Sequence, residues 1–362
     1  MESNPLTIAS TGPSGRWLRA WARLALGVAA IVALYYFGFL DIRALAPLRH
    51  APLTIAAAGG LILATLPIAT WRWAIILRAQ SLAVPLLPLL RVICISTFIG
   101  QVSFGPTSAD AVRAIYAWRL LRRARGRIAV SILADRALGM FSLLAVTATT
   151  MMLRWGRVRE VPELRLLAIS LMVCLVGAVI ACAALLATPS LLRLNLPRLH
   201  QYPRLQRLSE QIHDVLLAFR TRPGALGAAL CLSLVIHILT ITGFLLTAQS
   251  LAVGDVTLLD VAVAAPLAMV ANILPFTPGG LGVGEAAFAQ ICRWLAPAAA
   301  LPAPYASIFF AFRAISLVMI IPGAIAFVMH QHASRQGEEE SYFTNKSRAA
   351  GPILSSKSSA ER

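Results

Sequence analysis

Charged side chains interrupt four strongly apolar stretches of this sequence. A charge at the centre of a membrane-spanning helix costs about 2.5–3.5 kcal/mol on insertion scales, so each one needs a partner or a ligand. Arginine can bind a phosphate or carboxylate through two parallel N–H groups. The chemistry that these residues indicate is recognition of an anionic group within an apolar protein.

The first stretch is FIGQVSFGPTSADAVRAIYAWR, residues 98–119. Its glycines and its proline discourage a continuous helix, and polar side chains such as Gln101 could line a wet cavity. Asp110 and Arg113 are three residues apart, so on a helix they share a face and could pair or hold a charged head group. A plainer interpretation remains open, in which Arg113 simply begins a basic loop.

The second stretch contains Asp135 and Arg136 in SILADRALG, about two turns into an apolar helix. Adjacent helical residues point about 100° apart, so these two should not pair with each other. We expect each to have its own partner, with Arg113 the candidate for Asp135. Two roles stay open: a salt bridge that fixes helix packing, or contact with a head group or substrate.

The third stretch is ILPFTPGGLGVGEAAFAQI, residues 273–291. Its prolines end one helix, and Gly279, Gly280 and Gly282 lead into a second helix with Glu285 near its start. A helix N-terminus that opens into a cavity offers N–H groups to an anion. Alternatively, Glu285 itself occupies that end and compensates the helix dipole. The stretch lacks GxxxxGK[ST], so it is not a nucleotide loop.

Arg313 is the fourth deep charge, and it has no acidic neighbour in its own stretch, YASIFFAFRAISLVMII. We expect it to pair with Glu285, with Asp260 or with a phosphate. Pro322 and Gly323 predict a kink in the same helix.

The other reactive residue types are dispersed. Five cysteines and six histidines lie singly along the chain, without the spacing of a metal site, a disulfide framework or a nucleophile with its base. We therefore predict no metal, no cofactor and no catalytic residue, and do not expect an enzyme.

Composition places the chain in a membrane. Apolar residues make up 58% of it and charged residues only 13%, whereas soluble domains have about 25% charged residues. The net charge of +17 does not indicate nucleic-acid binding, which requires a basic face on a soluble fold.

We predict an all-α, polytopic protein with about six full transmembrane helices, and two broken or re-entrant hairpins within 86–112 and 258–298. The expected spans are 21–40, 51–77, 128–153, 164–186, 225–246 and 305–329.

Basic residues predict the orientation. Twelve arginines lie in residues 113–127 and 193–222, and such loops stay in the cytoplasm. Both termini are then cytoplasmic, and the two hairpins enter from opposite faces, which suggests an inverted repeat. The arginines of 154–165 fit this orientation poorly.

Residues 204–220 predict an amphipathic surface helix within the 21–330 transmembrane domain. Residues 1–20 form a cytoplasmic N-terminus, and 331–362 a disordered tail.

Three of these motifs occur in a familiar order. Residues 98–113 resemble the signature FxNQxLPxxxGGDxxR of bacterial and archaeal membrane proteins related to the flippase region of lysylphosphatidylglycerol synthases, with Gln101, Asp110 and Arg113 in register. SILADR and LPFTPGGLGVGE resemble that family's next and late blocks. The resemblance covers roughly residues 20–330. Gly100, Phe104, Ser108 and Ala109 depart from the first signature, and no lysyltransfer domain follows Met329.

The resemblance implies a flippase-like transporter in the bacterial inner membrane that moves an anionic or polyprenyl-linked lipid. The candidate binding residues are Gln101, Asp110, Arg113, Asp135, Arg136, Gly279, Gly280, Gly282, Glu285 and Arg313. In this interpretation the arginines hold the head group and the carboxylates balance them. The alternatives are a membrane-embedded transferase and an accessory subunit of a lipid- or glycan-modifying enzyme, with an envelope-biosynthesis enzyme as partner.

Overall fold

The computed structural model describes residues 43–102, 106–121, 125–187, 203–253, 255–273, 280–297 and 303–329, with a few single positions between 32 and 41 and at 277. Every regular element among them is helical, which confirms the all-α prediction for this part of the chain. Five helices are long and apolar enough to cross a membrane: Pro52–Ala79, Arg125–Leu153, Pro162–Ala187, Pro223–Leu251 and Ala306–Met329. They confirm five of the six expected spans. The sixth, 21–40, falls almost wholly outside the described residues, as do 1–20 and 331–362.

The same sequence of helix lengths occurs twice: long, short, short, long. The first unit comprises α2 (Pro52–Ala79), α3 (Leu86–Val102), α4 (Pro106–Leu121) and α5 (Arg125–Leu153). The second comprises α9 (Pro223–Leu251), α10 (Leu258–Ala271), α11 (Val283–Leu295) and α12 (Ala306–Ser316), which continues through the 3₁₀ turn η5 (Leu317–Met319) to residue 329. Between the units lie α6 (Trp155–Glu160), α7 (Pro162–Ala187) and α8 (Pro203–Thr221), and η1 (Arg43–His50) precedes α2.

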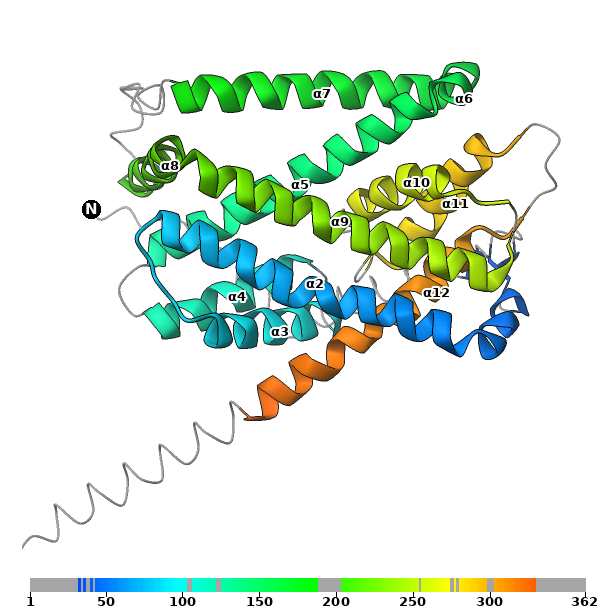
Figure 1. Ribbon diagram of the computed structural model, residues 1–362, viewed down its shortest axis with the longest axis horizontal. Helices are drawn as coiled ribbons and strands as arrows, with labels where there is room; N and C mark the ends of the chain where they lie inside the picture. Colours follow the sequence, from blue (N-terminus) through cyan, green and yellow to red (C-terminus); the bar gives the residue numbers. More distant parts are fainter. Residues whose placement is uncertain are drawn as a thin grey trace, which may run out of the picture.

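Helices α2 and α9 pack together along the middle of the bundle and run in opposite directions (Figure 1). Arg222, just before α9, donates a hydrogen bond to the carbonyl of Arg78 near the end of α2. The hairpin α3–α4 follows from that end, whereas α10–α11 follows from the other end of the bundle (Figure 1). The two short-helix hairpins therefore start from opposite ends.

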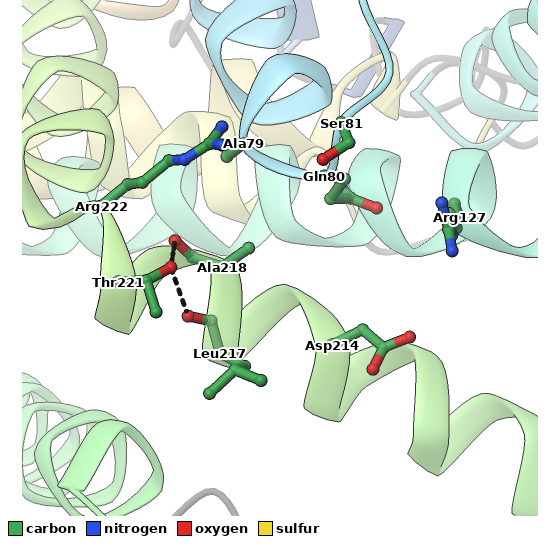
Figure 2. A pocket seen from close by; sticks show the side chains of 9 residues that line it. All are labelled: Ala79, Gln80, Ser81, Arg127, Asp214, Leu217, Ala218, Thr221 and Arg222. Carbon is green, nitrogen blue, oxygen red and sulfur yellow. Dashed lines mark hydrogen bonds between the residues drawn. The ribbon is translucent and has the colours of Figure 1, made fainter.

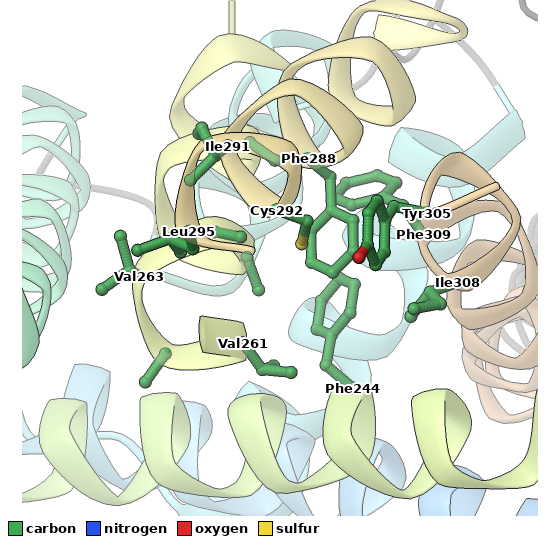
Figure 3. Close-up of a cluster of buried hydrophobic side chains, with 14 of the residues drawn as sticks. Phe244, Val261, Val263, Phe288, Ile291, Cys292, Leu295, Tyr305, Ile308 and Phe309 are labelled. Atoms are coloured by element: carbon green, nitrogen blue, oxygen red, sulfur yellow. The ribbon is translucent and has the colours of Figure 1, made fainter. Parts of the chain in front are cut away.

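An aromatic cluster holds the second unit together (Figure 3). The ring of Phe244 on α9 lies 3.5 Å from that of Phe312, 5.3 Å from that of Phe309 and 5.8 Å from that of Phe288, between ring centroids. Phe244 and Phe288 are completely buried. The pairs at 5.3 and 5.8 Å lie in the range where aromatic rings attract each other beyond simple burial, so the cluster ties α9 to α11 and α12.

The last helix departs from α geometry where the sequence predicts a kink. Pro322 has no N–H to donate to the carbonyl four residues earlier, at Val318, and the chain forms the 3₁₀ turn η5 there. Gly323 then allows close packing on α3, because a Cβ at this position would lie 2.4 Å from the carbonyl oxygen of Cys94.

Helix α8 confirms the amphipathic helix expected at 204–220. Its Gln211 packs so closely on α5 that a Cβ at Gly126 would lie 2.0 Å from the amide nitrogen. Helix α7 lies at the edge of the bundle, in contact with α5, α6 and α8 (Figure 1). Apolar side chains such as Leu166 and Val173 are about two-thirds exposed there, at 68% and 66%, as on a lipid-facing span.

Gly323→Ala should destabilise the protein by about 1–3 kcal/mol, because the added methyl group overlaps the backbone of α3. Gly60→Ala is the matched control, since nothing lies within 4 Å of a Cβ at that helical position. Alanine favours helix there by up to about 1 kcal/mol. Thermal unfolding midpoints of the detergent-solubilised variants test the difference, and equal midpoints for the two would contradict this packing.

Candidate functional site

The carboxylate of Asp135 joins three helices. Its Oδ1 accepts a hydrogen bond from Nε of Arg72 on α2 at 2.8 Å, and its Oδ2 accepts one from Nη1 of Arg113 on α4 at 2.8 Å. Arg72 Nη2 also donates to Oδ2, at 3.1 Å. The Asp135 side chain is only 3% exposed. The expected pair between Arg113 and Asp135 is confirmed, and Arg72 is a second partner that the sequence reasoning missed.

The surroundings of this carboxylate extend the contact to α9. Arg72 Nη1 donates to Oγ of Ser233 at 2.9 Å. The guanidinium of Arg113 lies over the indole ring of Trp73, 3.9 Å from its centroid, in a cation–π contact. The Trp73 indole N–H in turn donates to Ser131 at 3.1 Å. Residues from α2, α4, α5 and α9 thus converge on one buried point.

This point carries an excess of positive charge. Two guanidinium groups share the single carboxylate of Asp135. The Nε and Nη2 of Arg113 are buried and have no hydrogen-bond acceptor among the residues that the structure describes. Buried charged donors without acceptors are costly, so this position favours an additional anionic oxygen.

Asp110 and Arg136 form a second pair between α4 and α5. Arg136 Nε and Nη2 each lie 2.8 Å from a different oxygen of Asp110, which is a two-pronged arginine–carboxylate contact. The Arg136 side chain is 44% exposed and that of Asp110 is 28% exposed. The pair considered within α4, Asp110 with Arg113, does not form. Asp135 and Arg136 are adjacent on α5 and point in different directions, so each forms its ion pair with a different residue of α4.

Glu285 and Arg313 join α11 to α12 in the second unit. Arg313 Nε lies 2.8 Å from Oε1 of Glu285, whose side chain is fully buried. The other carboxylate oxygen accepts a hydrogen bond from the backbone N–H of Gly282 at 2.9 Å. Glu285 therefore occupies the N-terminal end of α11 itself, which was one of the two expectations for this residue, and it is the partner of Arg313.

The glycines of the late motif allow a tight turn around Asn272, which ends α10. Gly280 and Gly282 have φ of +70° and +81°, values that favour glycine. A Cβ at Gly280 or at Gly284 would lie 2.4 or 2.3 Å from Oδ1 of Asn272. Arg313 Nη2 also reaches the Gly280 carbonyl at 3.3 Å. Gly279 lies outside the described residues.

The structure places the predicted residues in two groups. Asp110, Arg113, Asp135 and Arg136 meet between α4 and α5, and Gly280, Gly282, Glu285 and Arg313 meet where α11 begins. Gln101 is exposed near the end of α3, and the hydrogen bonds and ion pairs described here do not link it to either group. The sequence signal for Arg72 was its position deep within an apolar span.

Two of the four arginines of 154–165 have side-chain partners among the described residues. Arg154 pairs with Asp260, which also caps the start of α10 through a capping box with Thr257. Arg157 pairs with Glu160 and donates to the carbonyl of Ala296. These two arginines hold α5 and α6 against the second unit. This packing role gives a structural reason for basic residues in a segment that the predicted orientation places outside the cytoplasm.

The first group of charged residues offers contacts for an anion. Among the described residues, no three of the histidine, cysteine, aspartate and glutamate side chains lie close enough together to hold a metal ion. The first group instead offers arginine N–H donors, which suit phosphate and carboxylate oxygens.

Asp135→Asn should destabilise the fold by about 3–5 kcal/mol, because it leaves two buried guanidinium groups without a counter-charge. Asp110→Asn removes the same charge from a partly exposed pair and should cost about 0–1 kcal/mol. Thermal unfolding of the purified variants in one detergent measures both. A shift for Asp110→Asn as large as that for Asp135→Asn would show that Asp135 is not the central contact.

Comparison with known proteins agrees with this arrangement. Residues 21–325 match the family model described as the lysylphosphatidylglycerol synthase TM region. No curated protein and no solved structure matches the chain. The match covers both helical units and both groups of charged residues, and no synthetase domain is detected. The chain is therefore a multi-pass membrane protein that belongs to the lysylphosphatidylglycerol synthase transmembrane region family.

Proposed function

We propose that this protein moves an anionic lipid, or a lipid-linked head group, between the two leaflets of the bacterial cytoplasmic membrane. The observation that carries the proposal is the excess positive charge beside Asp135. Two buried nitrogens of Arg113 find no acceptor there within the described part of the chain, at a point where four helices meet. A phosphate diester brings the negative charge and the oxygen acceptors that this point lacks.

Entry of the head group begins at the more accessible pair. Arg136 and Asp110 are partly exposed, so a phosphate can exchange with the Asp110 carboxylate on the two-pronged face of Arg136. The next residue along α5 is Asp135, which holds Arg113. A head group that moves from Arg136 to Arg113 passes from a solvated to a buried cation, while its acyl chains stay in lipid.

The paired hairpins supply the means of alternating access. We interpret α3–α4 and α10–α11 as re-entrant hairpins of an inverted repeat, since each follows a long helix and the two start from opposite ends of the bundle (Figure 1). In inverted-repeat transporters, interrupted helices form the binding site and the two halves rock around it. The Glu285–Arg313 pair is the counterpart of the Asp135 contact in the second half. In this orientation both termini of the chain lie in the cytoplasm.

Arg113→Gln tests the proposal without removing the central contact, because Asp135 keeps Arg72 as its partner. In proteoliposomes containing fluorescent phosphatidylglycerol, leaflet exchange measured by dithionite quenching should fall at least about tenfold. Arg113→Lys should recover little of the rate, because an ammonium group lacks the planar fork of arginine.

Arg159→Gln is the matched control, since it removes one exposed positive charge at the end of α6. Its exchange rate should equal that of the unmodified protein. Size-exclusion profiles and unfolding midpoints show whether each variant is folded. If the unmodified protein moves neither phosphatidylglycerol nor a polyprenyl phosphate, or if Arg113→Gln moves lipid at full rate, the proposal is wrong.

A further inference from the structure

A separate pocket of about 420 Å³ lies at the α8 end of the bundle (Figure 2). The end of α2, the start of α5, the second half of α8 and the residue before α9 line it. Its polar lining includes Gln80, Arg127, Asp214 and Arg222. None of these belongs to the two groups of charged residues described above.

Gln80 forms part of the wall of this pocket. Its side-chain nitrogen donates to the carbonyl of Ile76 on α2, at 3.4 Å. The residue is only 9% exposed, and its Oε1 is buried without a donor among the described residues. The contacts that a ligand can reach therefore come from the charged side chains.

Opposite charges line the pocket without neutralising each other. Arg127 reaches it from α5 and Asp214 from α8 (Figure 2). Both are exposed, and no ion pair of the described residues includes either of them. Arg222 adds a second positive charge, with one nitrogen bonded to the Arg78 carbonyl. The pocket thus offers donors for an anion and acceptors for a cation.

A ligand that carries both charges fits this lining. A phosphate diester suits the guanidinium of Arg127. A primary ammonium group has three N–H donors, which suit the exposed Asp214 carboxylate. We propose that this pocket binds the phosphoethanolamine head group of a membrane phospholipid.

The position of the pocket favours a lipid over a soluble compound with the same groups. It lies where α2 ends and where α5 and α9 begin, and all three helices are candidate spans. Lipid phosphates are found at the ends of membrane spans. The amphipathic α8 forms one wall, and such helices lie at the head-group level. The proposal does not depend on lipid movement by the Asp135 region.

Native mass spectrometry of the full chain in detergent tests this site with added phosphatidylethanolamine, phosphatidylglycerol or phosphatidylcholine. The unmodified protein should bind phosphatidylethanolamine at least about tenfold more tightly than the other two. Phosphatidylglycerol lacks the cation, and the quaternary ammonium of phosphatidylcholine has no N–H to donate. Arg127→Gln should weaken phosphatidylethanolamine about tenfold, whereas Asp214→Asn should reduce its affinity to that of phosphatidylglycerol.

Two charge controls accompany these variants. Arg125→Gln removes an exposed arginine two residues from Arg127, and Glu163→Gln removes an exposed carboxylate from the start of α7. Both should bind phosphatidylethanolamine as the unmodified protein does. The proposal is overturned if Arg127→Gln and Asp214→Asn match these controls. It is also overturned if free phosphoethanolamine displaces the lipid at equal concentration, which would assign the pocket to a soluble ligand.

Discussion

The bridge from Asp135 to Arg72 and Arg113 is the contact on which the first half of this membrane protein depends. Few interactions can order helices that are surrounded by lipid, because apolar contacts between helices compete with equally apolar lipid tails. One buried carboxylate with two guanidinium partners ties α2, α4 and α5 together. The Arg72–Ser233 hydrogen bond extends the tie to α9. The same contact leaves a positive charge in excess, and it is the place where we propose that an anion binds.

The two halves of the protein place their buried acidic and basic residues on different helices. In the first, the acid lies on the long helix α5 and its cations come from α2 and α4. In the second, the acid lies at the start of the short helix α11, and the cation comes from α12. Glu285 also caps α11, which makes that pair part of the helix end. The two halves are therefore alike in the order of their helices. They differ in buried charge, because the first half has two arginines for one carboxylate and the second has one for one.

Much of this arrangement could be predicted from the sequence. Helix lengths follow from apolar runs, and the partner of Asp135 followed from the cost of an isolated buried charge. Arg72 was missed although it lies within an apolar span, which is the same signal that singled out Asp135 and Arg136. The pairing of Asp110 with Arg136 could not be predicted either, since it depends on how α4 rotates against α5. Asn272 lacks a charge, and its close packing depends on Gly280 and Gly284, where a Cβ would overlap its side chain.

The crossed pairs between α4 and α5 also determine how these helices align along their lengths. Asp110 faces Arg136, and Arg113 faces Asp135, so acid and base alternate along the contact. If α4 slipped by one turn so that Arg113 took the place of Asp110, two positive charges would meet at Arg136. The same slip would take Arg113 away from Asp135, whose buried carboxylate would keep only Arg72. The order of signs along α4 and α5 therefore favours one alignment of the two helices.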